Sequence, residues 1–135
     1  MTHEMTTVSN DTYITAQTVC ALLEKLAAQY GDLPLTIFLD NASYQRCALV
    51  MEKANSLKIE LCFLPSYSPN LNLIERVWKF VKKHCLYSHY YEKFPAFKAA
   101  ISTCLQETAT TYKSELDSLL TLRFQTFDKA QFVTV

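Results

Sequence analysis

Two carboxylates occupy the positions in this chain that are best suited to chemistry. Asp40 follows the apolar run Leu35 to Leu39, at the expected carboxyl end of a strand, where ligands gather in open α/β sheets. Glu75 falls in the early turns of a helix that starts just after the next strand, so both side chains can face one sheet edge. Converging carboxylates suit a divalent cation such as Mg²⁺, and two such ions can support phosphodiester cleavage.

Each carboxylate also has a purely structural interpretation. Asp40 precedes Asn41 and Ser43, so it could cap the helix that these residues open. Glu75 near a helix N-terminus is favourable by a few tenths of a kcal/mol without any further role. The residue types alone leave both interpretations open.

The elements that must position these acids begin with a predicted βαβ unit. Short apolar runs at 35–39 and 59–64 predict two parallel strands, the first of them buried on both faces. The expected connecting helix spans about Ser43 to Leu57 and buries one face, which consists of Cys47, Val50, Met51 and Ala54.

Before this unit the sequence predicts a helix from an N-cap at Thr15 to Tyr30. Gly31 falls just past its end, where a left-handed residue commonly closes a helix. Alternation within Met1 to Val8 favours a short strand, followed by a turn at residues 9–11.

The second half is predicted to be helical. Ser68 and Pro69 are a strong helix start, and the helix should run to Leu86. Its expected buried face, Trp78 included, is made of Leu71, Ile74, Trp78, Val81 and Cys85. A last helical region from Pro95 to about Leu122 should break near residues 110–111. The intervening tyrosines at 87, 90 and 91 suit packing between helices better than stacking on unpaired bases.

Composition narrows the class of protein. The 135 residues are 50% hydrophobic and 19% charged, which fits one folded domain and excludes disorder. A single glycine excludes a Gly-rich phosphate loop. No apolar run approaches a membrane span and the first ten residues are polar, so we expect a cytoplasmic protein. Five scattered cysteines then serve as small core residues.

Two segments together resemble a known family. Leu39-Asp40-Asn41-Ala42, followed by the LPSYSPNLNLIERVWK string at residues 64–79, resembles the bacterial insertion-sequence branch of the mariner-like DDE transposases. The separation agrees as well, because 34 residues lie between Asp40 and Glu75. The resemblance covers about residues 13–122.

The resemblance implies an RNase H-like α/β fold, here incomplete because the first central strand is missing. It implies that Asp40 is the second catalytic aspartate and Glu75 the catalytic glutamate, which with a first aspartate bind Mg²⁺ or Mn²⁺ for cleavage and transfer of DNA at transposon ends. We expect a residual strand and turn at 1–14, the βαβ core with the acids at 15–75, basic helices at 76–122 and a tail at 123–135.

The neutral total charge conceals a division that matters for a DNA partner. Residues 1–75 carry four basic and eight acidic side chains, whereas residues 76–135 carry nine basic and five acidic. Arg76, Lys79 and Lys83 share a helix face beside Glu75. With the motif in view, we expect these three residues to contact DNA phosphates, Arg76 foremost because it is nearest.

Two departures from the family pattern shape the expected function. Gln45 stands where the family often has histidine, and the first catalytic aspartate has no equivalent among Glu4, Asp11, Glu24 and Asp32. We therefore expect a fragment of a transposase that is inactive by itself, being the product of a truncation, a frameshift or a separate reading frame. The unpaired strand edge predicts self-association or a partner that supplies the missing strand. The alternative is a non-catalytic remnant that binds DNA or a transposase partner.

Overall fold

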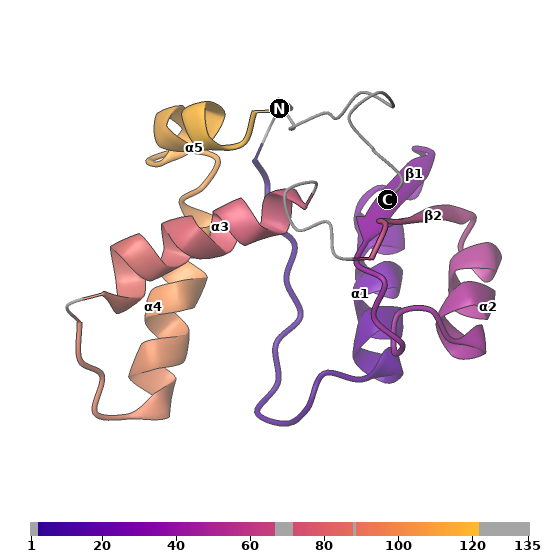
Figure 1. The fold of residues 1–135 in the computed structure, drawn as a ribbon, viewed down its shortest axis with the longest axis horizontal. Coiled ribbons are helices and arrows are strands. Elements are labelled where there is room, and N and C mark those ends of the chain that lie inside the picture. The colour runs from indigo at the N-terminus through magenta and orange to yellow at the C-terminus, as the bar shows by residue number, and fades with distance from the viewer. Residues whose placement is uncertain (1–2, 67–71, 88, 122–135) are drawn as a thin grey trace, which may run out of the picture. The chain divides into compact units, whose positions relative to one another are not determined.

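A computed structural model describes residues 3–66, 72–87 and 89–121 of the chain (Figure 1). These residues form five α-helices, a π-helical turn and a two-stranded parallel sheet, an arrangement compatible with an α/β nuclease-like fold. The chain divides into two compact units. The βαβ unit is Thr6–Ser68, and the helical unit combines Met1–Met5 with Pro69–Val135.

The βαβ unit begins with helix α1 (Ala16–Gln29), close to its predicted bounds. Thr15 is the N-cap, and its backbone N–H donates to the Thr18 hydroxyl at 3.2 Å. The predicted left-handed conformation of Gly31 is wrong, because this glycine has no positive φ. Its role is steric, since a Cβ at this position would lie 3.0 Å from the Ala27 carbonyl oxygen.

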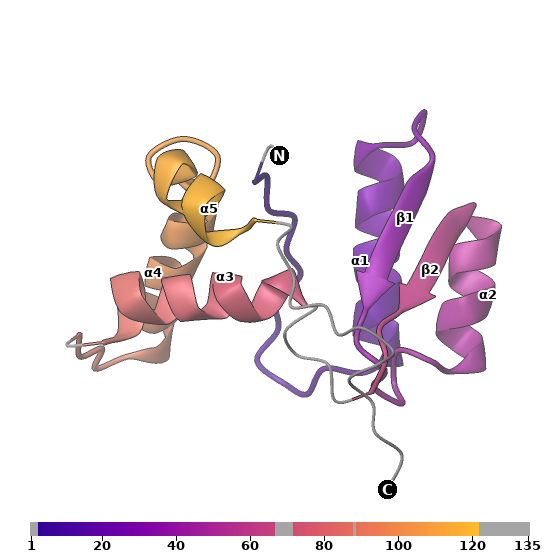
Figure 2. The same cartoon turned by 45° about the horizontal axis from the view of Figure 1, so that its top comes forward.

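Strands β1 (Leu35–Leu39) and β2 (Ile59–Phe63) pair in parallel, with Leu35 opposite Ile59, which confirms the predicted strand pair. Figure 2 shows both arrows running the same way. One face of the sheet, including Leu35 and Ile37, packs against α1 and α2. The opposite face carries Phe38, which is 69% exposed. The prediction that β1 is buried on both faces is therefore wrong, because both helices of this unit cover the same face.

Helix α2 (Ala48–Ser56) starts five residues later than the predicted Ser43. Residues 42–46 instead form turns, in which the Arg46 N–H donates to the Ala42 carbonyl. Val50 and Ala54 are buried as expected. Met51 is 47% exposed, so its predicted place in the core is wrong; the buried stripe of this short helix is narrower than the apolar pattern suggested.

In the helical unit, α3 (Leu73–Val81) continues into the π-helical turn η2 (Lys82–Leu86), which ends where predicted. The predicted cap, Ser68, and the buried Leu71 lie outside the described residues. The described helix starts at Leu73, and the Asn72 side chain caps it by accepting from the Ile74 N–H at 3.0 Å.

The buried face of α3 differs from the predicted one. Ile74 and Trp78 are each 46% exposed, so their assignment to the core is wrong. Val81 is buried as predicted, and the other core contacts of this helix come from Val77 and Phe80, which lie on the adjacent stripe. All three residues pack with residues of α4 and α5. Both stripes of this helix are apolar, so their spacing alone did not identify the buried one.

Helices α4 (Phe94–Gln106) and α5 (Lys113–Leu119) are separated by turns at 107–112, which confirms the predicted break. Cys85, Cys104 and Leu116 belong to the core between them, and all five cysteines of the chain are free thiols. Burial, followed by hydrogen bonding with Cys85, raises the pKa of the Cys104 thiol to about 12. The prediction that these two cysteines are core residues is confirmed.

The N-terminal segment contains no strand among residues 3–14, so the predicted strand in Met1 to Val8 is wrong. His3 is instead 5% exposed in the helical unit, where its Nε2 lies 2.6 Å from Asp117 Oδ1 on α5. The Thr108 hydroxyl lies 2.8 Å from the His3 carbonyl oxygen. These polar contacts, with Met5 packed on the core, hold the segment in a non-strand conformation.

Candidate active site

Asp40 lies at the carboxyl edge of the parallel sheet, immediately after β1. The Leu64 N–H donates to the Leu39 carbonyl at 2.8 Å, which continues the strand pairing to the residue before Asp40. The chain around Asp40 is exposed. The paired strands therefore present this carboxylate at the edge where open α/β sheets bind ligands.

Beside Asp40, a polar network joins the ends of both strands. The Asn41 amide donates to the Ser66 hydroxyl at 3.0 Å, and Arg46 Nη1 donates to Asn41 Oδ1 at 2.7 Å. The Arg46 guanidinium also lies over the Phe63 ring, 5.2 Å from its centroid. These contacts connect the loop after β1 with the loop after β2 and restrict the backbone next to Asp40.

The sequence-based prediction did not include this network. The sequence did contain an indication of this network, because a polar residue follows each of the two parallel strands, at positions 41 and 66. Arg46 follows Asn41 by five residues, and its side chain reaches Asn41 because residues 42–46 form turns instead of the predicted helix.

Glu75 occupies the first turn of α3 and is exposed. The Asn72 cap fixes the start of this helix, and the Glu75 N–H donates to the Asn72 carbonyl at 3.3 Å. A carboxylate here lies favourably in the field of the helix dipole, by about 0.3–1 kcal/mol. That stabilisation is compatible with a ligand-binding role, because an exposed carboxylate keeps oxygen atoms accessible.

The two predicted catalytic acids belong to different units, Asp40 to the βαβ unit and Glu75 to the helical unit. Their convergence stays a prediction. Both supply the oxygen donors that Mg²⁺ and Mn²⁺ prefer, so the donor chemistry fits a divalent cation. Within residues 3–66, 72–87 and 89–121, no group of three or more His, Cys, Asp or Glu side chains is arranged to hold a metal.

The three predicted DNA-contacting residues differ in their surroundings. Arg76 is half-buried, and its Nη1 donates to the carbonyl oxygens of Thr121 at 2.7 Å and Leu119 at 3.4 Å, at the end of α5. Lys83 forms an ion pair with Glu115 at 3.0 Å. Lys79 is exposed, and within the described part of the chain it makes no ion pair or hydrogen bond.

Glu115 is the acidic centre of this part of the helical unit. Its carboxylate accepts from His84 at 2.9 Å as well as from Lys83, and these hydrogen bonds lower the pKa of Glu115. His84 in turn packs between Phe80 and Tyr112, with ring centroids 4.5 and 4.6 Å away. The Glu115 carboxylate neutralises part of the basic helix face by pairing with Lys83. Of the three predicted DNA-contacting residues, Lys79 is therefore the most available to a phosphate.

A family comparison agrees with the motif that surrounds both acids. A protein-family model described as DDE superfamily endonuclease matches residues 2–98. The match spans well over half of the chain and includes β1, β2, α3 and η2, so the chain belongs to the DDE superfamily endonucleases. Membership implies a transposase-like nuclease function and, in general, the use of divalent metal ions.

Two further findings complete this description. No curated protein matches the chain. Among the helices that the structure describes, none has the length and apolar character needed to cross a membrane.

Proposed function

We propose that the chain is part of the catalytic domain of a DNA transposase, of the mariner-like type found in bacterial insertion sequences, with an RNase H-like fold. One observation carries this proposal. The parallel β1–β2 pair presents Asp40 at its carboxyl edge, and the family motif that follows β2 leads directly to Glu75 in the first turn of α3. This order of strand, acid, strand, motif and acid lies within the matched residues.

In this proposal, Asp40 and Glu75 hold Mg²⁺ or Mn²⁺. When bound, the metal stabilises the charge that develops during phosphodiester cleavage. Asn41 and Arg46 act as positioning residues, because their hydrogen bonds connect the two strand ends and limit the freedom of the Asp40 backbone. A carboxylate held in this way loses less conformational entropy when it binds a cation.

We propose that this 135-residue polypeptide does not cleave DNA by itself, because none of the four acids that precede Asp40 takes the place of the family's first catalytic aspartate. The acids at 4, 11, 24 and 32 all lie outside the two described strands. Glu24, in the middle of α1, pairs with Lys53 at 2.6 Å. A second candidate function follows from the same observation: the polypeptide binds DNA or a transposase partner without performing chemistry.

The proposed DNA contact is the basic face of α3 and η2, with Lys79 and Lys83 at its exposed side and Arg76 at its buried side. The proposed protein partner is a second copy, or a chain that supplies a strand beside β1. Two features support such a partner. Among the described residues β1 pairs with β2 alone, which leaves its other edge open to a further strand. The sheet face that α1 and α2 do not cover carries the exposed Phe38 ring, and exposed apolar surface favours association with a second copy.

The activity is tested with supercoiled plasmid DNA and Mg²⁺ or Mn²⁺. We expect no nicking by the wild-type polypeptide, and nicking that Asp40→Asn or Glu75→Gln abolishes would refute the proposed inactivity. Metal binding is tested separately by titrating Mn²⁺ and recording its paramagnetic resonance signal. We expect Mn²⁺ binding to weaken in both variants and not in Glu52→Gln, an exposed α2 control. Equal binding by all four proteins would contradict the proposed metal role of the two acids.

A further inference from the structure

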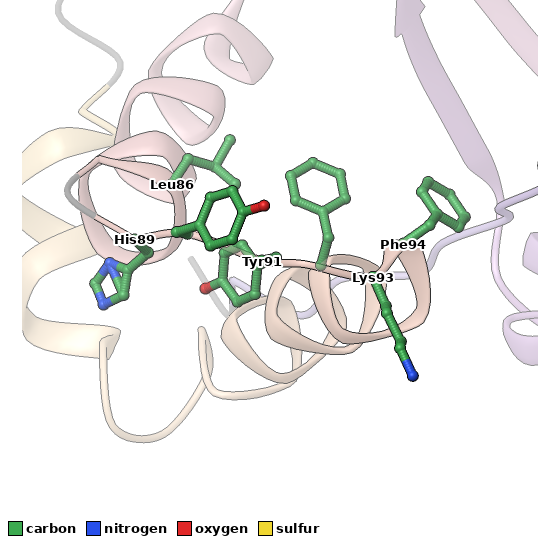
Figure 3. Close-up of a pocket in the computed structure, with 7 residues that line it drawn as sticks. Leu86, His89, Tyr91, Lys93 and Phe94 are labelled. Carbon is green, nitrogen blue, oxygen red and sulfur yellow. The ribbon is translucent and has the colours of Figure 1, made fainter.

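An aromatic hollow lies between the end of η2 and the first turns of α4, entirely within the helical unit (Figure 3). Its volume is about 380 Å³, within the range of roughly 300–1,000 Å³ typical of small-molecule sites. The lining is dominated by aromatic rings. The hollow lies within the residues that the family model matches, but neither proposed catalytic acid lines it.

One side of the hollow is held rigidly by the fold. The Tyr91 hydroxyl donates to the Cys85 carbonyl at 2.7 Å, and the Tyr91 ring meets Phe97 edge-on at a centroid distance of 5.9 Å. Leu86 completes this side. These side chains already have fixed positions, so a planar ligand that packs against them does not have to order them.

The other side of the hollow is open to solvent. Tyr90 is 89% exposed and Phe94 is 55% exposed, although both line the hollow. Packing between helices, the role expected for the tyrosines from the sequence, therefore fits Tyr91 and not Tyr90. An exposed ring beside a fixed aromatic wall provides two surfaces between which a flat ligand can insert.

The charged residues of the lining indicate which class of planar ligand the hollow can bind. Lys93 and His89 line it, and Glu92, which precedes Lys93 in the chain, is not among the lining residues. Figure 3 shows the Lys93 side chain extending away from the rings, with its ammonium group at the outer end. A ligand that combines a flat apolar group with an external negative charge matches this arrangement, and a nucleotide has both features.

We propose that the hollow binds the base of an unpaired nucleotide in single-stranded DNA, while Lys93 contacts the adjacent phosphate. This inference rests on the proposed DNA-binding function. A base inside a duplex has both faces covered by its neighbours, so only a base outside the stack can insert between the rings. Base–aromatic stacking tolerates any base, so the hollow would recognise strand separation and not sequence.

The proposal is tested with the whole polypeptide by fluorescence anisotropy on three labelled DNAs: oligothymidylate, an abasic strand of equal length, and a duplex. The variant is Tyr90→Ala, and the control is Tyr13→Ala, a comparably exposed tyrosine in the other unit. We expect Tyr90→Ala to weaken oligothymidylate binding by about 5- to 100-fold, as for one lost base stack. Abasic and duplex binding should be unchanged, as should all binding by the control.

Other outcomes separate this proposal from the proposed function. If Tyr90→Ala binds oligothymidylate as wild type does, or loses abasic binding equally, the hollow does not stack bases, while duplex binding leaves the transposase proposal intact. If wild type binds none of the three DNAs, the DNA-binding part of the proposed function fails. If Tyr90→Ala instead changes the molar mass in light scattering, the hollow is a contact between copies and the nucleotide proposal is wrong. Phe94→Ala provides an independent second variant.

Discussion

Replacement of Arg76 by alanine separates a structural role from a DNA-binding role on the same helix face. In the structure, Arg76 Nη1 donates to the Thr121 and Leu119 carbonyls at the end of α5, where the helix leaves its last carbonyls without intrahelical partners. The 2.7 Å bond is charge-assisted, and such bonds contribute about 1.5–3 kcal/mol. The 3.4 Å bond is close to the distance limit and adds little, so we expect Arg76→Ala to lower the free energy of unfolding by about 2 kcal/mol.

Lys79→Ala is the matched comparison, because Lys79 is exposed one turn further along α3. We expect its free energy of unfolding to stay within about 0.5 kcal/mol of wild type. Its effect should appear in DNA binding instead, where loss of one phosphate contact reduces the slope of log K against log salt by about 0.9. Arg76→Ala should change this slope less, since its guanidinium is occupied by α5.

Urea denaturation followed by circular dichroism measures the first quantity, and fluorescence anisotropy on duplex DNA at several salt concentrations measures the second. Arg76→Lys should recover part of the lost stability, because lysine keeps the charge near the end of α5. The reasoning is refuted if Arg76→Ala is as stable as wild type, or if Lys79→Ala destabilises the protein equally. An unchanged salt slope in Lys79→Ala would remove this helix face from the proposed DNA contact.

Two further predictions concern the acid sensitivity and the association of the chain. Hydrogen bonds from His3, and then from Lys113, lower the pKa of Asp117, so this group stabilises the folded state above its unfolded pKa of about 3.9 and ceases to do so as the pH falls through its lower folded value. In wild type, the urea concentration at the unfolding midpoint should therefore decrease when the pH is lowered below about 4. If the variant Asp117→Asn shows the same decrease, the assignment to Asp117 is wrong. Phe38→Ser should reduce the average molar mass measured by light scattering, since this 69%-exposed ring lies on the uncovered sheet face. The control Tyr13→Ser should leave the mass unchanged, and an equal mass in all three proteins would argue against association through that face.

Local patterns predicted the elements whose formation depends on local residues. The apolar run 35–39 gave β1 with its observed bounds, and Thr15 gave the start of α1. The parallel pairing followed from the spacing of strand, helix and strand, because a short crossover helix favours that geometry. The predicted break near residues 110–111 falls within the turns that separate α4 from α5.

The errors arose where a neighbouring element decides the outcome. Ile74 and Trp78 have helical spacing as good as that of the buried residues, but α4 and α5 pack on the adjacent stripe. Gly31 ends a helix as expected, although the proximity of the Ala27 carbonyl explains the glycine better than handedness does. For α3 the sequence offered two acceptable faces, and helices distant in sequence selected one of them. For Gly31 the deciding contact is local, with a carbonyl four residues earlier in the chain.

The sequence by itself determined the family, because acids and a long motif at fixed spacing are properties of the chain alone. It also determined which residues to propose as catalytic, Asp40 and Glu75. Only the tertiary structure distinguished Arg76 from Lys79 and Tyr91 from Tyr90. These pairs are chemically similar and close in sequence, but one member of each contacts carbonyl oxygens inside the fold while the other faces solvent. Availability to a ligand depends on that difference, and it is set by packing.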